Sequence, residues 1–220
     1  MKQAPMQNPG NAVPLAWVWP MVAALVPLVF GVAWKDWLWW AALVAPCTGT
    51  LAAGCWRPWL GGIASLSWLA AWTWLGRDLP HGHLLGGLGG LVGLLCCGWA
   101  MGQLAGKKSV LSAALMALVL CLFLTGAPAG FWLFSDPPWS PSSAARLLDV
   151  SPAALLMESA GVDFLRLPAI YGPVGADCMD PNLRLAWGNL AGWGVGVLGL
   201  CLSTAAWTCH RRKTVPERIQ

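Results

Sequence analysis

Charged residues are scarce in this sequence: 13 Lys and Arg and 9 Asp and Glu make up 10% of its 220 residues. A soluble domain carries about a quarter charged residues, so this chain could not cover its surface with solvated groups in water. Hydrophobic residues make up 57% of it, and the mean hydropathy is +0.61. The shortage of charge excludes an ordinary soluble domain and indicates lipid as the main solvent.

The motifs of common enzyme classes are also missing. The sequence has no Gly-x-Ser-x-Gly elbow, no Gly-x-x-x-x-Gly-Lys nucleotide loop and no His-Glu-x-x-His zinc motif. His81 and His83 offer too few ligands for a metal or a haem, and an exposed turn is expected there. No charge lies deep in an apolar run, which argues against a proton relay or an ion-coupled pump. We therefore expect no enzyme activity, no catalytic residue, no metal and no cofactor.

A disulfide framework does not follow from the eight cysteines. Most lie in apolar runs, where cysteine behaves as a small hydrophobe. Cys178 lies in a long polar loop without an obvious partner, and no Cys-x-x-Cys motif or Cys/His metal spacing occurs. The net charge of +4 is explained by membrane orientation, so no nucleic-acid partner is expected.

Long uncharged apolar runs are what the sequence has in abundance. A helix needs about 20 apolar residues to cross the hydrocarbon of a bilayer. The runs predict an all-α, polytopic membrane bundle of about six transmembrane helices, and many of the 17 Trp residues are expected at span ends, where bilayer interfaces favour indole rings. The expected spans are 13–34, 37–56, 59–76, 84–106, 109–134 and 185–208. The boundary between the second and third spans is the least secure, because only Arg57 and Pro58 separate them.

The distribution of charge predicts the orientation. Under the positive-inside rule, residues 1–12 form a short cytoplasmic N-terminus, 13–134 hold spans one to five, 135–184 form an extracytoplasmic loop, 185–208 form span six, and 209–220 form a basic cytoplasmic tail. All acidic residues except Glu217 then lie outside. Two clusters are expected to anchor the cytoplasmic face and to contact membrane lipids: Lys107, Lys108, Arg211, Arg212 and Lys213. The expected location is the bacterial inner membrane.

The long outer loop contains the signature of a short helix. Ser151 is a typical N-cap, Pro152 suits the first helical position, and Gly161 is a typical stop. We expect one or two short amphipathic helices, lying on the membrane surface or folded over the bundle mouth. As the gate of an exit path we single out Ser151, Pro152, Leu155, Leu156 and Phe164.

Glycines recur at helical spacing in the fourth and sixth spans. Small residues at such spacing let membrane helices approach closely, which predicts packing faces within the bundle, or alternatively a dimer contact or a sliding contact. The expected packing residues are Gly86, Gly90, Gly93, Gly98, Gly102, Gly106, Gly192 and Gly196.

The layout resembles the six-span permease subunits of ATP-binding-cassette exporters. Three features carry the resemblance. Residues 149–152 precede a short helix in the largest outer loop. Leu185-Ala186-Trp187 opens the last span, and Trp207 precedes the basic cluster at its end. The resemblance implies a transport function driven by a separate nucleotide-binding subunit. The chain departs from the family in its short N-terminus and in having only residues 56–59 where a coupling helix would contact the ATPase.

Three hypotheses for function follow. The first is a transport-type permease subunit without its own ATPase, working as a homodimer or with other membrane subunits. The second is a structural or assembly subunit of a larger membrane complex, without a substrate. The last is an intramembrane enzyme, which would have to use the outer carboxylates with His81 or His83.

Overall fold

The computed structural model describes residues 13–31, 34–54, 58–106, 109–134, 146, 148–162 and 187–214. Within these residues every regular element is a helix, which confirms the all-α prediction. The long helices are α1 (Val13–Val29), α2 (Trp34–Gly54), α3 (Pro58–Leu75), α4 (His81–Ala105), α5 (Val110–Phe134) and α9 (Leu190–Thr214), and the short helix is α7 (Pro152–Ser159).

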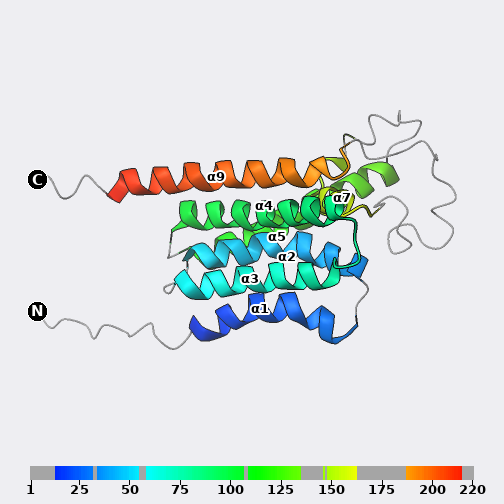
Figure 1. Cartoon of the computed structure of the whole chain (residues 1–220). Helices are drawn as coiled ribbons and strands as arrows, with labels where there is room; N and C mark the ends of the chain where they lie inside the picture. The colour runs from blue at the N-terminus through cyan, green and yellow to red at the C-terminus, as the bar shows by residue number, and fades with distance from the viewer. Residues whose placement is uncertain are drawn as a thin grey trace, which may run out of the picture.

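The long helices lie roughly side by side in one bundle (Figure 1). The start of α1 and the end of α9 lie at the same end of this bundle, and α7 lies at the opposite end, here named the α7 end. α4 packs most extensively against α9 and α2, so it occupies the centre of the bundle. α9 lies at one edge, where among the described helices it packs mainly on α4 and α7.

Three of the described helices are long and apolar enough to cross a membrane: His81–Ala105, Val110–Ala127 and Leu190–His210. They identify a membrane protein. The other expected spans also coincide with helices, but α2 begins with Lys35 and Asp36, and α2 and α3 are rich in Trp, Gly, Ser and Thr, which lower their mean hydropathy.

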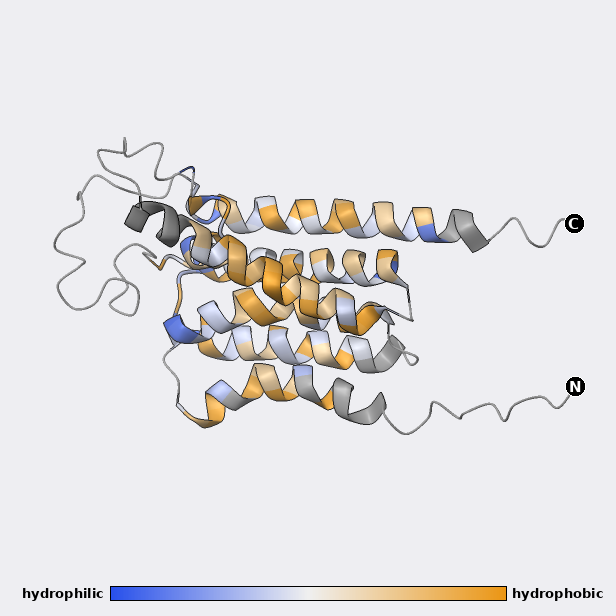
Figure 2. Ribbon diagram, turned by 180° about the vertical axis from the view of Figure 1, so that it is seen from behind, coloured by the Kyte–Doolittle hydropathy of each residue, from blue (hydrophilic) through white to orange (hydrophobic). Residues whose placement is uncertain are grey.

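Apolar residues predominate along α5 and α9 (Figure 2), and many of their large apolar side chains are exposed. A lipid environment suits such side chains, because transfer of apolar groups out of water is favourable. Exposed large hydrophobic residues on the two helices are Leu111, Leu115, Met116, Val119, Leu120, Leu122, Phe123, Leu190, Trp193, Val197, Leu198, Leu200, Leu202 and Trp207.

The last helix differs in its bounds from the expected span 185–208. Residues 187–189 form a turn, and α9 begins at Leu190 and continues to Thr214. Trp187 therefore precedes the helix, a correction to the expectation that it opens the last span. Arg211, Arg212 and Lys213 fall within the final turn of α9, whereas Lys107 and Lys108 lie outside the described residues.

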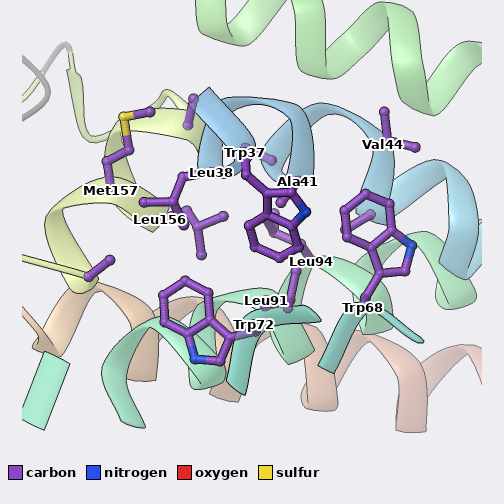
Figure 3. Close-up of a cluster of buried hydrophobic side chains, with 14 of the residues drawn as sticks. Trp37, Leu38, Ala41, Val44, Trp68, Trp72, Leu91, Leu94, Leu156 and Met157 are labelled. Atoms are coloured by element: carbon purple, nitrogen blue, oxygen red, sulfur yellow. The ribbon is translucent and has the colours of Figure 1, made fainter. Parts of the chain in front are cut away.

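Three fully buried tryptophans form the centre of the core (Figure 3). The ring centroids of Trp37 and Trp68 are 5.7 Å apart, and those of Trp37 and Trp72 are 6.3 Å apart. Each indole N–H donates a hydrogen bond: Trp37 to the Ala24 carbonyl at 3.1 Å, Trp68 to the Thr48 hydroxyl at 3.0 Å, and Trp72 to the Leu84 carbonyl at 3.1 Å. The expectation that many tryptophans mark span ends does not separate surface rings from core rings: these three lie inside the bundle, which their satisfied N–H groups allow.

Glycines allow α4 to approach both of its main neighbours. On the α9 side, a Cβ atom on Gly93 would overlap the backbone of Val195, and one on Gly192 would overlap the Gly86 carbonyl. On the α2 side, a Cβ atom on Gly98 would overlap the Pro46 carbonyl. The Ser203 hydroxyl adds a polar contact by donating to the Cys96 carbonyl at 2.9 Å.

The other glycines singled out from the sequence divide into two groups. Gly90 lies against Leu156 and Gly192, Gly102 against Thr50 and Ala53 of α2, and Gly196 against Gly89. Gly106 makes no such contact: it ends α4 with φ 73, a backbone conformation that favours glycine. The glycines of α4 thus allow close packing against two helices, α9 along the first half of α4 and α2 along its second half.

Candidate functional site

The short helix α7 is built as its sequence predicts. The Ser151 hydroxyl accepts a hydrogen bond from the Ala154 N–H at 3.2 Å, Pro152 occupies the first turn, and Gly161 follows the helix with φ 74. These observations confirm the predicted N-cap and the predicted stop. A Cβ atom on Gly161 would lie 2.9 Å from Nδ1 of His83, so the chain passes close to the first turn of α4 at this point.

α7 is not amphipathic, because almost every side chain in it is buried. It packs against α2, α4, α5 and α9 rather than lying on a surface. Ser151, Leu156 and Met157 are at most 1% exposed, and the two apolar ones join the tryptophan core (Figure 3). Of the two expected positions, the one folded over the bundle mouth agrees with the structure.

The residues singled out as a gate occupy different environments. Ser151 is the buried N-cap, Pro152 and Leu155 are half-buried, and Leu156 is in the core. Phe164 lies outside the described residues. Leu156 also touches Gly90 of α4, where a Cβ atom would meet its side chain at 3.2 Å, so α7 is tightly packed against the bundle.

A polar site lies at the α7 end, where α7 meets the start of α9. Glu158 Oε1 accepts hydrogen bonds from the backbone N–H groups of Trp187 at 2.8 Å and Gly188 at 2.5 Å. Asp149 Oδ2 accepts one from the indole Nε1 of Trp187 at 2.9 Å. Gly188 has φ 54, where an L side chain would be strained, and this turn aims both N–H groups at one oxygen.

The site is buried at Glu158 and open to solvent at Trp187, which is 56% exposed. Glu158 is only 6% exposed. Burial raises the pKa of its carboxyl, the two backbone N–H donors lower it, and the nearby Asp149 raises it, with a net upward direction. Three buried polar atoms here have no hydrogen-bond partner among the described residues: Glu158 Oε2, Asp149 Oδ1 and His83 Nδ1.

This site was missed from the sequence, which placed Glu158 merely among the acidic residues of the loop. The signal that could have found it is a single carboxylate inside the apolar segment 152–160, since such a group is rarely buried unless it is paired or hydrogen-bonded. Of the other outer carboxylates, Asp163 and Asp177 lie outside the described residues. His81 is exposed, as expected, but His83 is half-buried beside Gly161.

The site anchors the start of α9 through hydrogen bonds to two carboxyl groups. Within the described ranges, no group of three or more His, Cys, Asp or Glu side chains is arranged to hold a metal ion. The carboxylates instead accept N–H groups at the turn that leads into α9, where negative charge also suits the helix macrodipole.

Comparison with models of known protein families, with curated proteins and with solved structures found no match.

Proposed function

We propose that the chain is a transport-type permease subunit in a membrane, working with a separate ATPase or with other partner chains. The observation that constrains this proposal most directly is the filled interior of the bundle. Trp37, Trp68 and Trp72 occupy its centre with their N–H groups satisfied. A substrate path would therefore have to run along an outer face of the bundle and be completed by a second copy or another subunit.

Two further features fit a permease of the exporter type. The first is the helix α7, inserted at one end of the bundle between α5 and α9 in the chain, the place that the resemblance assigns to the outer loop. The second is the set of exposed apolar side chains on α5 and on α9, which a partner chain or lipid can cover. The proposal also places both termini in the cytoplasm of a bacterial cell.

The same filled interior favours a second candidate, a structural or assembly subunit of a larger membrane complex. No Asp, Glu, Lys or Arg occurs in the described part of α4, α5 or α9 before the last turn of α9, so these helices offer no charged pathway. Such a subunit would use its apolar faces for packing only. The two candidates differ in the partner that they need.

Gentle purification tests the proposal. The tagged chain is extracted from its native membranes into a mild detergent, and the chains that remain bound are identified by mass spectrometry while ATP hydrolysis is measured. A permease subunit retains a nucleotide-binding chain in a fixed ratio, with ATP hydrolysis that is lost when the tagged chain is omitted. Membrane chains without a nucleotide-binding partner would support the assembly role instead, and a lone monomer would contradict the permease proposal.

The proposed topology makes a separate prediction about two cysteines. Cys178 falls in the loop that precedes α9, and Cys209 lies near its other end, exposed. In variants that keep one of the two as the only cysteine, a membrane-impermeant maleimide added to intact cells is expected to label Cys178 and to leave Cys209 unlabelled until the membrane is broken. A control with a permeant maleimide verifies that both thiols react. Labelling of both from outside would overturn the six-span arrangement.

A further inference from the structure

Two carboxyl groups at the α7 end hold the same tryptophan. Glu158 binds the backbone N–H of Trp187, and Asp149 binds its indole N–H. The two acidic side chains reach Trp187 from sequence positions 29 and 38 residues away, so they join α7 and the segment before it to the start of α9. Because both carboxyls contact one residue, they are brought close enough to repel each other when both are ionised.

Each carboxyl group uses only one of its oxygens in these bonds. The other oxygen, Oε2 of Glu158 or Oδ1 of Asp149, is buried and has no hydrogen-bond partner among the described residues. An ionised carboxylate only accepts hydrogen bonds, whereas a protonated one also donates. A single proton on Glu158 therefore removes the repulsion and gives its carboxyl group a donor that the ionised form lacks.

We propose that Glu158 and Asp149 form a proton-binding site in which one proton, carried by Glu158, holds α7 against the start of α9. The proton comes from a hydronium ion in water, whose O–H bond breaks as the O–H bond on Glu158 forms, and it returns to water when the site ionises. This inference does not rest on the proposed permease function, since it concerns only the bonds between α7 and the 187–189 turn.

The direction of the pH dependence follows from the surroundings of Glu158. Its pKa is raised in the folded chain, chiefly by burial. The folded chain therefore binds more protons than the unfolded chain between the ordinary and the raised pKa, and stability falls as pH rises through that window. Above the raised pKa the site is ionised and the α7 end is held least firmly.

Among the described residues, the elements packed against α7 carry few other charged groups. From α4, His83 is half-buried and lies against Gly161, whereas His81 is exposed. α2 contributes Lys35 and Asp36, both exposed, and Arg146 before α7 is exposed as well. The described residues of α5 contain no acid, base or histidine, and those of α9 contain none before His210. His83 is thus the competing group that a test has to separate.

Isosteric variants of the whole chain in lipid nanodiscs test the proposal. The melting temperature is measured across the pH range, and the infrared C=O band of protonated carboxylic acids is recorded at each pH. The wild type is expected to lose stability as pH rises, together with its acid band. E158Q keeps the accepting oxygen and is expected to melt at least as high as the wild type at neutral pH, to lose that pH dependence and to lack the band.

Two further variants decide between the carboxyl pair and His83. In D149N a negative charge beside Glu158 is removed, so the transition is expected to move to lower pH. In H83Q the transition is expected to stay where it is. The proposal is overturned by an acid band that survives in E158Q, by a transition that disappears in H83Q, or by D149N and the wild type titrating together. Should E158Q not fold, the D149N shift alone decides.

Discussion

Replacing Gly192 by alanine is expected to destabilise the folded chain by about 1–3 kcal/mol or more, although only one methyl group is added. A Cβ atom at this position would overlap the carbonyl of Gly86 on α4 and lie 2.8 Å from Cβ of Ser159 on α7. Backbone atoms cannot turn away as a flexible side chain can, so α9 would have to move off both neighbours. The loss of stability is measured by thermal unfolding in detergent, which is monitored through the reaction of newly exposed thiols with a fluorogenic maleimide.

Gly194 provides the matched control, two residues further along the same helix. A Cβ atom there has no neighbour within 4 Å. Alanine has a higher helix propensity than glycine by up to about 1 kcal/mol, so Gly194→Ala is expected to leave stability unchanged or to raise it slightly. If the two variants melt alike, the close approach of α9 to α4 and α7 is incorrect.

Replacing Trp37 by alanine is expected to have the largest effect of any single side-chain truncation in the core, about 3–5 kcal/mol. Trp37 is fully buried, contacts both other core tryptophans, and donates to the Ala24 carbonyl of α1. Its removal leaves a large cavity and one buried carbonyl without its donor. The expected result is a strongly lowered melting temperature, together with greater access of protease to α1, which loses this hydrogen bond.

Trp74 is the control for this truncation. It lies near the end of α3, is 66% exposed, and stacks only on the exposed Arg77, with 5.2 Å between guanidinium carbon and ring centroid. Exposed cation–π contacts are worth about 0.5–1 kcal/mol, so Trp74→Ala is expected to cost no more than that. If the two alanine variants lost equal stability, Trp37 would not lie in the core.

Much of the helical architecture could be predicted from the sequence, because the physics that determines it is local. A run of about 20 uncharged apolar residues has to satisfy its backbone within itself in lipid, and only a helix does so. The α7 signals are local too: Ser151 caps, Pro152 starts and Gly161 stops the helix within a few residues of one another.

The partners of each helix could not be predicted in the same way. Glycine spacing indicates that α4 packs closely on something, but it does not say that Gly93 meets α9 and Gly98 meets α2. For the same reason the sequence does not show that Trp37, Trp68 and Trp72 are the tryptophans that enter the core. Their burial depends on acceptors at Ala24, Thr48 and Leu84, which come from elsewhere in the chain.

The polar site could not be predicted from the sequence because it joins residues that are far apart in the chain. Glu158 has no partner within its own helix; its donors are the N–H groups of Trp187 and Gly188. A sequence shows that a carboxylate stands in an apolar segment, but the two N–H groups become available only once the 187–189 turn is folded beside α7.

The unbroken length of α9 has a mechanical consequence. The helix begins two residues after Gly188 and runs for 25 residues, a rise of about 37 Å, so it reaches from the carboxyl pair to the basic residues at its far end. Along this length small residues bring its backbone into close contact with that of α4. The carboxyl pair and the basic cluster therefore stand at opposite ends of one continuous helix, separated by more than the roughly 30 Å of hydrocarbon in a bilayer.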